Sequence, residues 1–239
     1  MYVTAFYDIY GKPENFIKYI YLFYDLGISG LPIVVFTDPS LVHKFRIFPP
    51  LVKVIGIPLE EFETYKLAMS YNGELPPARS EIKDTKEFFA IMNTKVEFIL
   101  KASQLFEKEE SFIWIDFGIL KIVKDTYEFI NKLFEIYRHR NTFDKIKIPG
   151  CWAIPQAFSV NKIDWRFCGG FFVIPRKHIQ YFYDYAKHVL YDFCTMSMYK
   201  LTWETNVWNI VEHCSEVKIF DWYQADHNDS IVMNLKINP

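Results

Sequence analysis

The fold is indicated most clearly by one stretch, Phe112-Ile113-Trp114-Ile115-Asp116-Phe117-Gly118-Ile119. Its first four residues are apolar and favour a buried strand, which ends at an aspartate and turns at a glycine. A carboxylate at the end of a buried strand is costly to remove from water unless a cation, a metal or hydrogen-bond donors stabilise it. Asp116 is therefore the residue at which we first expect chemistry.

Outward from this stretch, short apolar runs alternate with amphipathic ones. The pattern predicts strands at residues 2–7, 31–37, 51–57, 112–115, 145–152, 165–174 and 217–222, a helical turn at 40–45, and helices at 14–26, 85–106, 125–137, 176–198 and 203–214. Continuously apolar strands separated by helices indicate an α/β fold whose mostly parallel central sheet is flanked by helices. We expect a single domain over residues 1–239, in which the polar residues 60–79 form a surface excursion or a flap.

Composition and charge limit the kinds of partner that the chain can bind. The 239 residues carry a formal net charge of -2, so the chain lacks the positive field of a duplex-DNA binder, and we expect no nucleic acid partner. The 27 lysines and arginines still suffice for a local basic cleft that accepts a nucleotide diphosphate. Because no apolar run approaches the roughly 20 residues of a membrane span and no signal peptide is recognisable, we expect a soluble, cytoplasmic protein without a transmembrane segment.

Several chemistries are disfavoured by missing motifs. Cys151, Cys168, Cys194 and Cys214 are far apart in sequence and include no C-x-x-C pair, which indicates four reduced, mostly buried thiols. No G-x-G-x-x-G, P-loop, G-x-S-x-G or H-E-x-x-H motif occurs, which argues against dinucleotide oxidoreductases, P-loop kinases and several hydrolase classes. The remaining candidates use carboxylates and metals.

Four acids, Asp8, Asp38, Asp116 and Asp221, lie at or near the carboxyl ends of predicted strands. In an open parallel sheet the ligand crevice lies at that edge, although aspartate also ends strands simply by starting turns. Lys95 falls within the apolar stripe of the helix predicted at residues 85–106. Either its stem packs while its ammonium reaches solvent, or it points into a ligand cleft.

Taken in order along the chain, these segments resemble a known family. Val3-Thr4-Ala5-Phe6-Tyr7-Asp8, Asn93-x-Lys95 and the stretch at residues 112–119 are similar to the HtrL/YibB group of glycosyltransferase-like proteins, and more broadly to nucleotide-diphospho-sugar transferases of the GT-A fold. In such enzymes an apolar strand ends in Asp-x-Asp, whose carboxylates hold Mn or Mg against the donor diphosphate. Here the triplet is Asp116-Phe117-Gly118, as the HtrL/YibB pattern tends to have it, which leaves metal dependence open.

Three later segments extend the resemblance. Cys168-Gly169-Gly170-Phe171-Phe172 is similar to the glycine-rich strand that lines the sugar pocket of GT-A enzymes. Trp203-Glu204-Thr205-Asn206-Val207-Trp208-Asn209 resembles the start of a helix that carries an acid, here Glu204, toward the sugar or the acceptor. Asp226-His227-Asn228 resembles a loop that supplies a further metal ligand.

The resemblance implies a GT-A-like enzyme that transfers a sugar from a UDP- or GDP-linked donor to a hydroxyl of a glycan, lipid or protein acceptor. It also implies that Mn or Mg assists the transfer. The implied roles are nucleoside binding for Asp8 and Asp38, metal binding for Asp116, Asp226 and His227, sugar contact for Gly169 and Gly170, donor contact for Arg79, Asn93 and Lys95, and base or sugar-orienting acid for Glu204. The basic residues would neutralise the diphosphate even without a metal.

Two other functions remain open. One is a noncatalytic nucleotide-sugar or glycan binding protein that kept the fold and lost the second acid of the triplet. The other is a nucleotidyltransferase, which uses the same metal and carboxylate chemistry but would more often carry a glycine- and lysine-rich loop after the first strand. Tyr10-Gly11-Lys12-Pro13 is only a short match to such a loop. Simpler roles also exist for His227, as an ordinary loop histidine, and for Glu204, as an acid favoured by the helix dipole.

Overall fold

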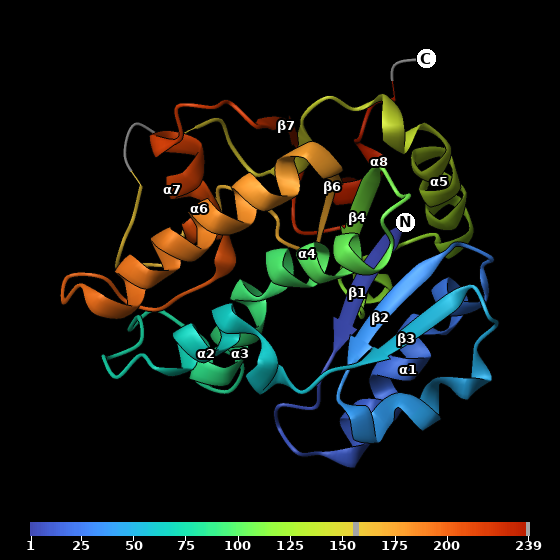
Figure 1. Ribbon diagram of the computed structural model, residues 1–239, viewed down its shortest axis with the longest axis horizontal. Helices are drawn as coiled ribbons and strands as arrows, with labels where there is room; N and C mark the ends of the chain where they lie inside the picture. Colours follow the sequence, from blue (N-terminus) through green and yellow to red (C-terminus); the bar gives the residue numbers. More distant parts are fainter. Residues whose placement is uncertain (155–157, 238–239) are drawn as a thin grey trace.

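A computed structural model describes residues 1–154 and 158–237. Within these residues, seven strands form one sheet in the order β3-β2-β1-β4-β6-β5-β7. The strands are β1 (Tyr2–Phe6), β2 (Ile33–Thr37), β3 (Val52–Gly56), β4 (Ser111–Ile115), β5 (Ile146–Gly150), β6 (Phe171–Pro175) and β7 (Phe220–Gln224). The order places β1 and β4, which are far apart in sequence, side by side at the centre of the sheet (Figure 1).

The sheet is mostly parallel, as the sequence predicts. Strands β3, β2, β1 and β4 pair in parallel, and so do β5 and β7. Strand β6 is antiparallel to both of its neighbours, β4 and β5. The carboxyl ends of β1 and β4 therefore lie at the same edge, where an open parallel sheet binds its ligands.

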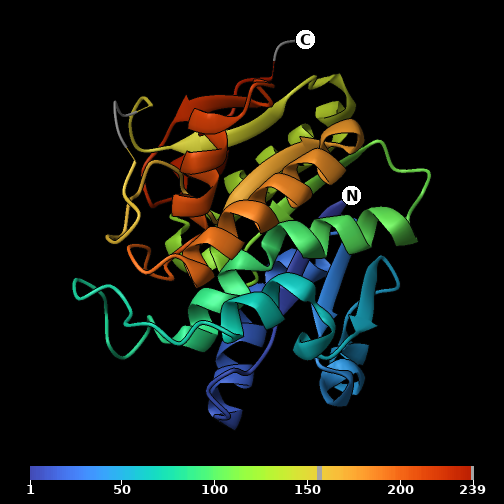
Figure 2. The same ribbon diagram turned by 60° about the vertical axis from the view of Figure 1, so that its left-hand side comes forward.

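Helices cover both faces of the sheet (Figures 1 and 2). One face packs on α1 (Pro13–Ile28), α5 (Thr126–His139) and α8 (Ser230–Met233), and the other on α2 (Glu63–Met69), α3 (Lys86–Asn93), α4 (Lys95–Leu105), α6 (Arg176–Thr195) and α7 (Glu204–Cys214). Successive residues of β1 alternate between these cores, since Tyr2 belongs to the first and Val3 to the second. Short 3-10 helices occur at Pro39–Ile47, Leu59–Glu61, Ile119–Ile122 and Arg140–Thr142.

The prediction of a surface excursion at residues 60–79 is wrong for its first half. Helix α2 lies there, and its residues Tyr65 and Ala68 are buried in the core. No local side chain caps the helix. Instead the carboxylate of Glu97, in α4, accepts hydrogen bonds from the backbone N–H groups of Glu63 at 2.9 Å and Thr64 at 2.8 Å. A buried carboxylate on the first-turn amides satisfies groups that a helix otherwise leaves unpaired.

Three further boundaries differ from the sequence predictions. The helix predicted at residues 85–106 is divided into α3 and α4 at Thr94, whose hydroxyl donates to Ala90 O at 2.9 Å, a contact that bends helices. Gly169 and Gly170 lie in the turn before β6, not inside a strand. Asp221 lies within β7, where its carboxylate pairs with Lys147, so it is not at a strand end.

Within the described part of the chain, no helix combines the length and the apolar character that crossing a membrane requires.

Candidate functional site

A cavity of about 410 Å³ opens at the carboxyl ends of β1 and β4. It is bounded by the segment after β1, the turn after β4, the turn before β6, the start of α7 and the loop before α3. The predicted site residues among its lining are Asp8, Lys95, Asp116, Gly169, Gly170, Glu204 and His227. The structure thus brings together residues that are separated by almost the whole chain.

Lys95 forms the centre of the cavity floor. Its Nζ lies 2.7 Å from Glu204 Oε1, 3.0 Å from Asp116 Oδ1 and 2.9 Å from Gly169 O. The side chains of Lys95 and Glu204 are each 1% exposed, while that of Asp116 is 38% exposed. Of the two orientations left open for Lys95, the structure therefore shows the one that points into the cleft.

The charges of this trio perturb one another. Burial alone would lower the pKa of Lys95, but the carboxylates of Asp116 and Glu204 outweigh burial and raise it above its ordinary value. Burial raises the pKa of Glu204, and the attraction of Lys95 offsets only part of that effect. Two carboxylates around one ammonium leave a net charge of -1 when all three are ionised. Glu204 Oε2 is buried and has no hydrogen-bond partner among the described residues, so one acceptor of this carboxylate is unsatisfied.

Asp116 is held by groups from β4 and from the turn before β6. Its Oδ1 accepts from Trp114 Nε1 at 2.9 Å, and its backbone N–H donates to Gly170 O at 2.9 Å. A Cβ built on Gly170 would lie 3.5 Å from Asp116 Oδ2. With Oδ1 occupied by Lys95 and Trp114, Oδ2 is the oxygen of this carboxylate that remains for a ligand.

Gly169 makes room for the buried ion pair. A Cβ at this position would collide with Glu204 Oε1 and would lie 3.0 Å from Glu204 Cδ. The missing side chain thus lets the carboxylate of Glu204 reach Lys95. The sequence predicts that a sugar approaches this glycine, and the structure shows that Glu204 approaches it.

Two lysines that sequence reasoning missed line the outer part of the cavity. Lys83, before α3, and Lys121, after β4, are both exposed and both belong to the lining. The Nζ of Lys83 lies 4.5 Å from the centre of the Trp203 ring. Partial loss of hydration around its ammonium and, after it, the charge of Lys121 lower the pKa of Lys83. We call these two lysines the basic rim, as opposed to the acidic floor formed by Lys95, Asp116 and Glu204.

Asp38 and Asn93 do not line the cavity, and both have structural partners. Asp38 caps the 3-10 helix Pro39–Ile47 by accepting from Ser40 N at 2.8 Å. The side-chain amide of Asn93 is buried and donates to Phe89 O and to Thr202 O, each at 2.8 Å. Asn93 thereby ties α3 to the segment that leads into Glu204, which is a positioning contact.

Arg79 and Asp226 also lie outside the cavity lining. Arg79 lines a neighbouring cavity, and its Nη1 donates to Pro76 O at 3.3 Å. Asp226 is exposed, and its backbone N–H donates to Ser230 Oγ at 2.9 Å.

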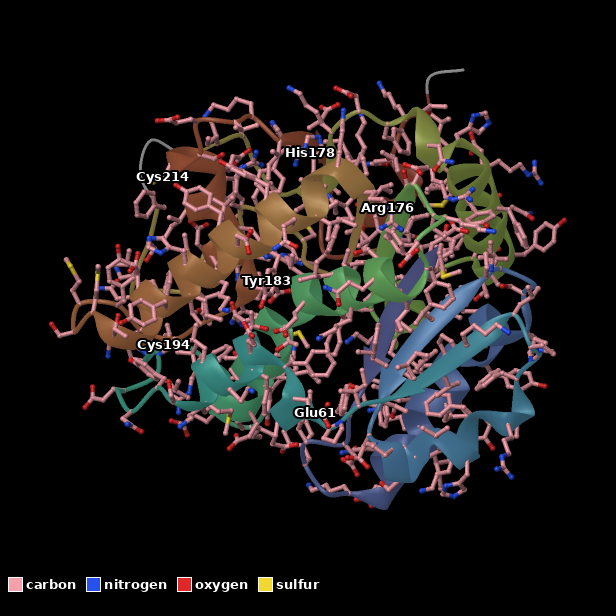
Figure 3. All side chains as sticks on the ribbon, viewed as in Figure 1. Glu61, Arg176, His178, Tyr183, Cys194 and Cys214 are labelled. Carbon is pink, nitrogen blue, oxygen red and sulfur yellow. The ribbon has the colours of Figure 1, made fainter. Side chains whose placement is uncertain are left out.

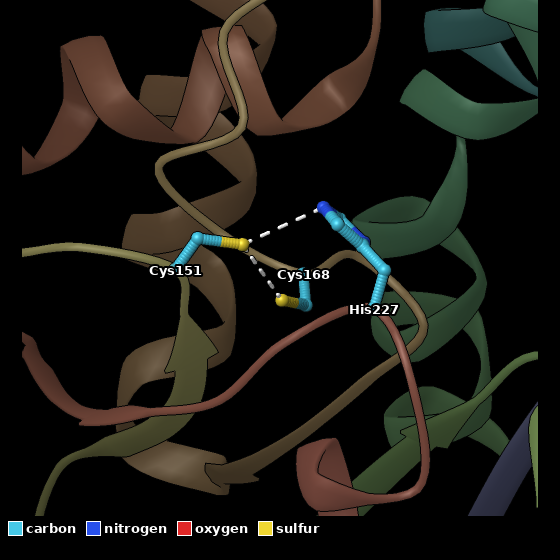
Figure 4. Close-up of side chains that lie close together, drawn as sticks. All are labelled: Cys151, Cys168 and His227. Atoms are coloured by element: carbon cyan, nitrogen blue, oxygen red, sulfur yellow. Dashed lines mark hydrogen bonds between the residues drawn. The ribbon is translucent and has the colours of Figure 1, made fainter.

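The three metal ligands expected from the sequence are not gathered into one site. Among the described residues, the group of three potential ligands whose atoms all lie within 4.8 Å of one another consists of Cys151, Cys168 and His227 (Figure 4). His227 therefore groups with two thiols, and Asp116 and Asp226 are not members of that group. No sequence motif signalled this cluster, because its members are separated by up to 76 positions.

No protein-family model and no curated protein sequence matches this chain. Solved structures do match it, one of them described as "crystal structure of a glycosyltransferase involved in the glycosylation of the major capsid of PBCV-1". The two share 10% sequence identity with a TM-score of 0.40, over 93% of this chain and 81% of the other. That identity and that TM-score are too low for the likeness to establish a shared activity. The resemblance to the HtrL/YibB group stays a prediction.

Proposed function

We propose that this chain is a glycosyltransferase that moves a sugar from a nucleotide-sugar donor to a hydroxyl acceptor. The observation that supports it is the polarity of the cavity, with a basic rim of Lys83 and Lys121 and an acidic floor around Lys95. A nucleotide sugar has the complementary polarity. Its diphosphate is negative, and its glycosyl carbon becomes positive as the bond to the diphosphate breaks.

The donor would then bind in one direction. Its diphosphate lies at Lys83 and Lys121, where the two ammonium groups stabilise the charge that develops on the leaving group. Its sugar lies at the floor, where the net negative charge of the trio favours an oxocarbenium-like transition state. Cavities at the carboxyl edge of parallel strands are the usual ligand sites of such sheets.

Glu204 is the group that we propose to act on the acceptor. Its Oε2 is unpaired, and burial raises its pKa, so the carboxylate is a stronger base than an exposed one. In this proposal Oε2 accepts the proton of the acceptor hydroxyl or a hydrogen bond from the sugar.

Asp8 is the candidate for nucleoside contact. It lines the cavity, and its Oδ1 is buried without a partner among the described residues. A hydroxyl or N–H of the nucleoside would satisfy that oxygen. Tyr10 and Tyr19 also line the cavity, and in this proposal the ring of one of them stacks on the base.

Mn or Mg fits this site only in part. Asp116 Oδ2 has no hydrogen-bond donor among the described residues, and Gly118 replaces the second acid. Hard divalent ions are often bound by one or two carboxylates together with substrate phosphates. We therefore propose that Asp116 and the donor diphosphate would share the ion, without Asp226 or His227. When bound, the ion would add positive charge beside the leaving diphosphate.

Calorimetric titration with UDP and GDP, with and without MnCl2, tests the donor site. We expect saturable binding of one of them, weakened in a Lys83→Ala/Lys121→Ala variant. Absence of binding under all four conditions would refute the proposal.

A noncatalytic binding protein is the second candidate, and the single acid at Asp116 is the observation that favours it. Nucleotide binding without any slow release of UDP or GDP from the sugar donors would select this alternative. The binding protein and the transferase are both expected to bind the nucleotide, and only the transferase is expected to release it from a sugar donor.

A further inference from the structure

Cys151, Cys168 and His227 converge from three neighbouring strands (Figure 4). Cys151 follows β5 directly, Cys168 precedes β6, and His227 follows β7, and these strands are adjacent in the sheet. Cys168 is buried, Cys151 is half-buried and His227 is exposed. Both thiols are free. The cluster therefore combines two sulfur ligands and one imidazole in a place that a solute can reach.

The distances match a tetrahedral metal site. Cys151 Sγ lies 3.5 Å from Cys168 Sγ and 3.5 Å from His227 Nε2. With zinc bonds of about 2.3 Å to sulfur and about 2.0 Å to nitrogen, tetrahedral angles place two sulfurs about 3.8 Å apart and a sulfur and a nitrogen about 3.5 Å apart. The ligand atoms of Cys168 and His227 lie within 4.8 Å of each other, so they would move closer together by up to about 1 Å when a metal binds.

The backbone holds two of the ligands in this arrangement. Three hydrogen bonds fix the main chain, from Cys151 N to Arg166 O at 3.1 Å, from Cys168 N to Pro149 O at 2.9 Å, and from Ala225 N, two residues before His227, to Gly150 O at 2.9 Å. The ring of Trp165 packs edge-on against His227, with 5.0 Å between the ring centres. Ligands held by strands need little reorganisation to bind a metal, which favours affinity.

We propose that Cys151, Cys168 and His227 form a binding site for a thiophilic transition metal, of which Zn²⁺ fits best. Thiolate and imidazole ligands select zinc over the hard ions Mn²⁺ and Mg²⁺, so this site is chemically different from the one proposed at Asp116. Binding displaces one proton from each thiol and leaves the two thiolates and the neutral imidazole on the metal.

The site has three protein ligands and a fourth position toward the cavity. Cys168 and His227 belong to the lining of the same cavity as Lys95 and Asp116. Zinc with three protein ligands usually takes water or a bound solute as the fourth. The metal would thus lie in the wall of the cavity, where an oxygen of a bound molecule can reach it.

The test uses the reduced full-length chain titrated with CoCl2, followed by ZnCl2. Cobalt bound by thiolates gives charge-transfer absorption in the near ultraviolet, so the readout needs neither a sugar donor nor activity. We expect one cobalt per chain, displaced by zinc. Cys151→Ser and His227→Gln should each weaken binding by more than about tenfold, since loss of an outer-shell partner alone commonly costs that much.

Matched controls come from the other two thiols. Cys194 lies near the end of α6 and Cys214 at the end of α7 (Figure 3), and neither belongs to the cluster. Cys194→Ser and Cys214→Ser should leave cobalt binding unchanged. Because Cys168 is buried and its replacement risks unfolding, Cys151→Ser and His227→Gln decide the result, with circular dichroism to confirm that both variants are folded.

Two results would overturn the proposal. One is a reduced wild-type protein without thiolate–cobalt absorption. The other is the same cobalt affinity in Cys151→Ser and His227→Gln as in the wild type. Neither result affects the proposed sugar transfer, which is measured by nucleotide binding and donor turnover.

Discussion

Replacing Lys95 by methionine removes the cation from the cavity floor while keeping most of the side-chain volume. Glu204 would then be a buried carboxylate without its partner at 2.7 Å, and breaking a buried pair costs about 3–5 kcal/mol. The contact with Asp116 adds at most about 1 kcal/mol, because that carboxylate is 38% exposed and solvent screens it. We therefore expect Lys95→Met to lose about 3–6 kcal/mol of unfolding free energy at neutral pH.

The loss should depend on pH with a definite sign. Burial already raises the pKa of Glu204 in the wild type, and without Lys95 it rises further. A carboxyl group whose folded-state pKa lies above its unfolded value contributes stability below the unfolded pKa and loses it as pH rises through the folded pKa. The stability difference between Lys95→Met and the wild type should therefore shrink as the pH falls from neutral toward the unfolded pKa of glutamate.

Urea unfolding followed by tryptophan fluorescence measures these differences. Glu204→Gln and the double variant Lys95→Met/Glu204→Gln complete a thermodynamic cycle. Since the double variant holds no unpaired carboxylate at position 204, it should be more stable at neutral pH than Lys95→Met alone by at least about 1 kcal/mol. Additive effects, or a Lys95→Met deficit that is the same at every pH, would refute the buried ion pair.

Further predictions concern the glycines and the basic rim. Gly169→Ala should destabilise the fold by roughly 1–3 kcal/mol in urea unfolding, because its Cβ would collide with the carboxylate beside Lys95. Gly170→Ala, whose Cβ would meet atoms at 3.3–3.5 Å, should cost less, and equal costs would contradict this explanation. Lys83→Ala and Lys121→Ala should each weaken binding of the preferred nucleoside diphosphate severalfold in calorimetry, with a smaller salt dependence than in the wild type. Unchanged affinity in both variants would contradict the proposed role of the basic rim in binding the diphosphate.

Much of the fold could be predicted because its signals are local. The strands around Val34 and Ile113 are continuously apolar, and such runs separated by helices define a parallel sheet. Helix α2 was missed because its capping group is not local. Glu97 accepts a hydrogen bond from the backbone N–H of Glu63, which is 34 positions away in the sequence. No pattern within residues 60–79 predicts this capping contact.

The site could be predicted where sequence order marks it and not where only the folded chain creates it. Asp116 directly follows a strand and Glu204 begins a helix, and both elements are recognisable in the sequence. Their positions alone therefore indicate them as candidate site residues. Lys83 has no such mark, because a lysine in a loop is ordinarily a solvated surface residue. The grouping of Cys151 with His227 depends on the pairing of β5 with β7, which sequence spacing does not reveal.

The central claim is most directly tested by the release of UDP or GDP from a panel of nucleotide sugars. Without acceptor, the wild type should release the nucleotide slowly, since an active transferase usually transfers donor sugar to water. Asp116→Asn should abolish this release, while the surface control Asp144→Asn, whose carboxylate is 82% exposed, should retain it. Equal turnover by Asp116→Asn and the wild type would contradict the account, as would a wild type that releases no nucleotide from any donor.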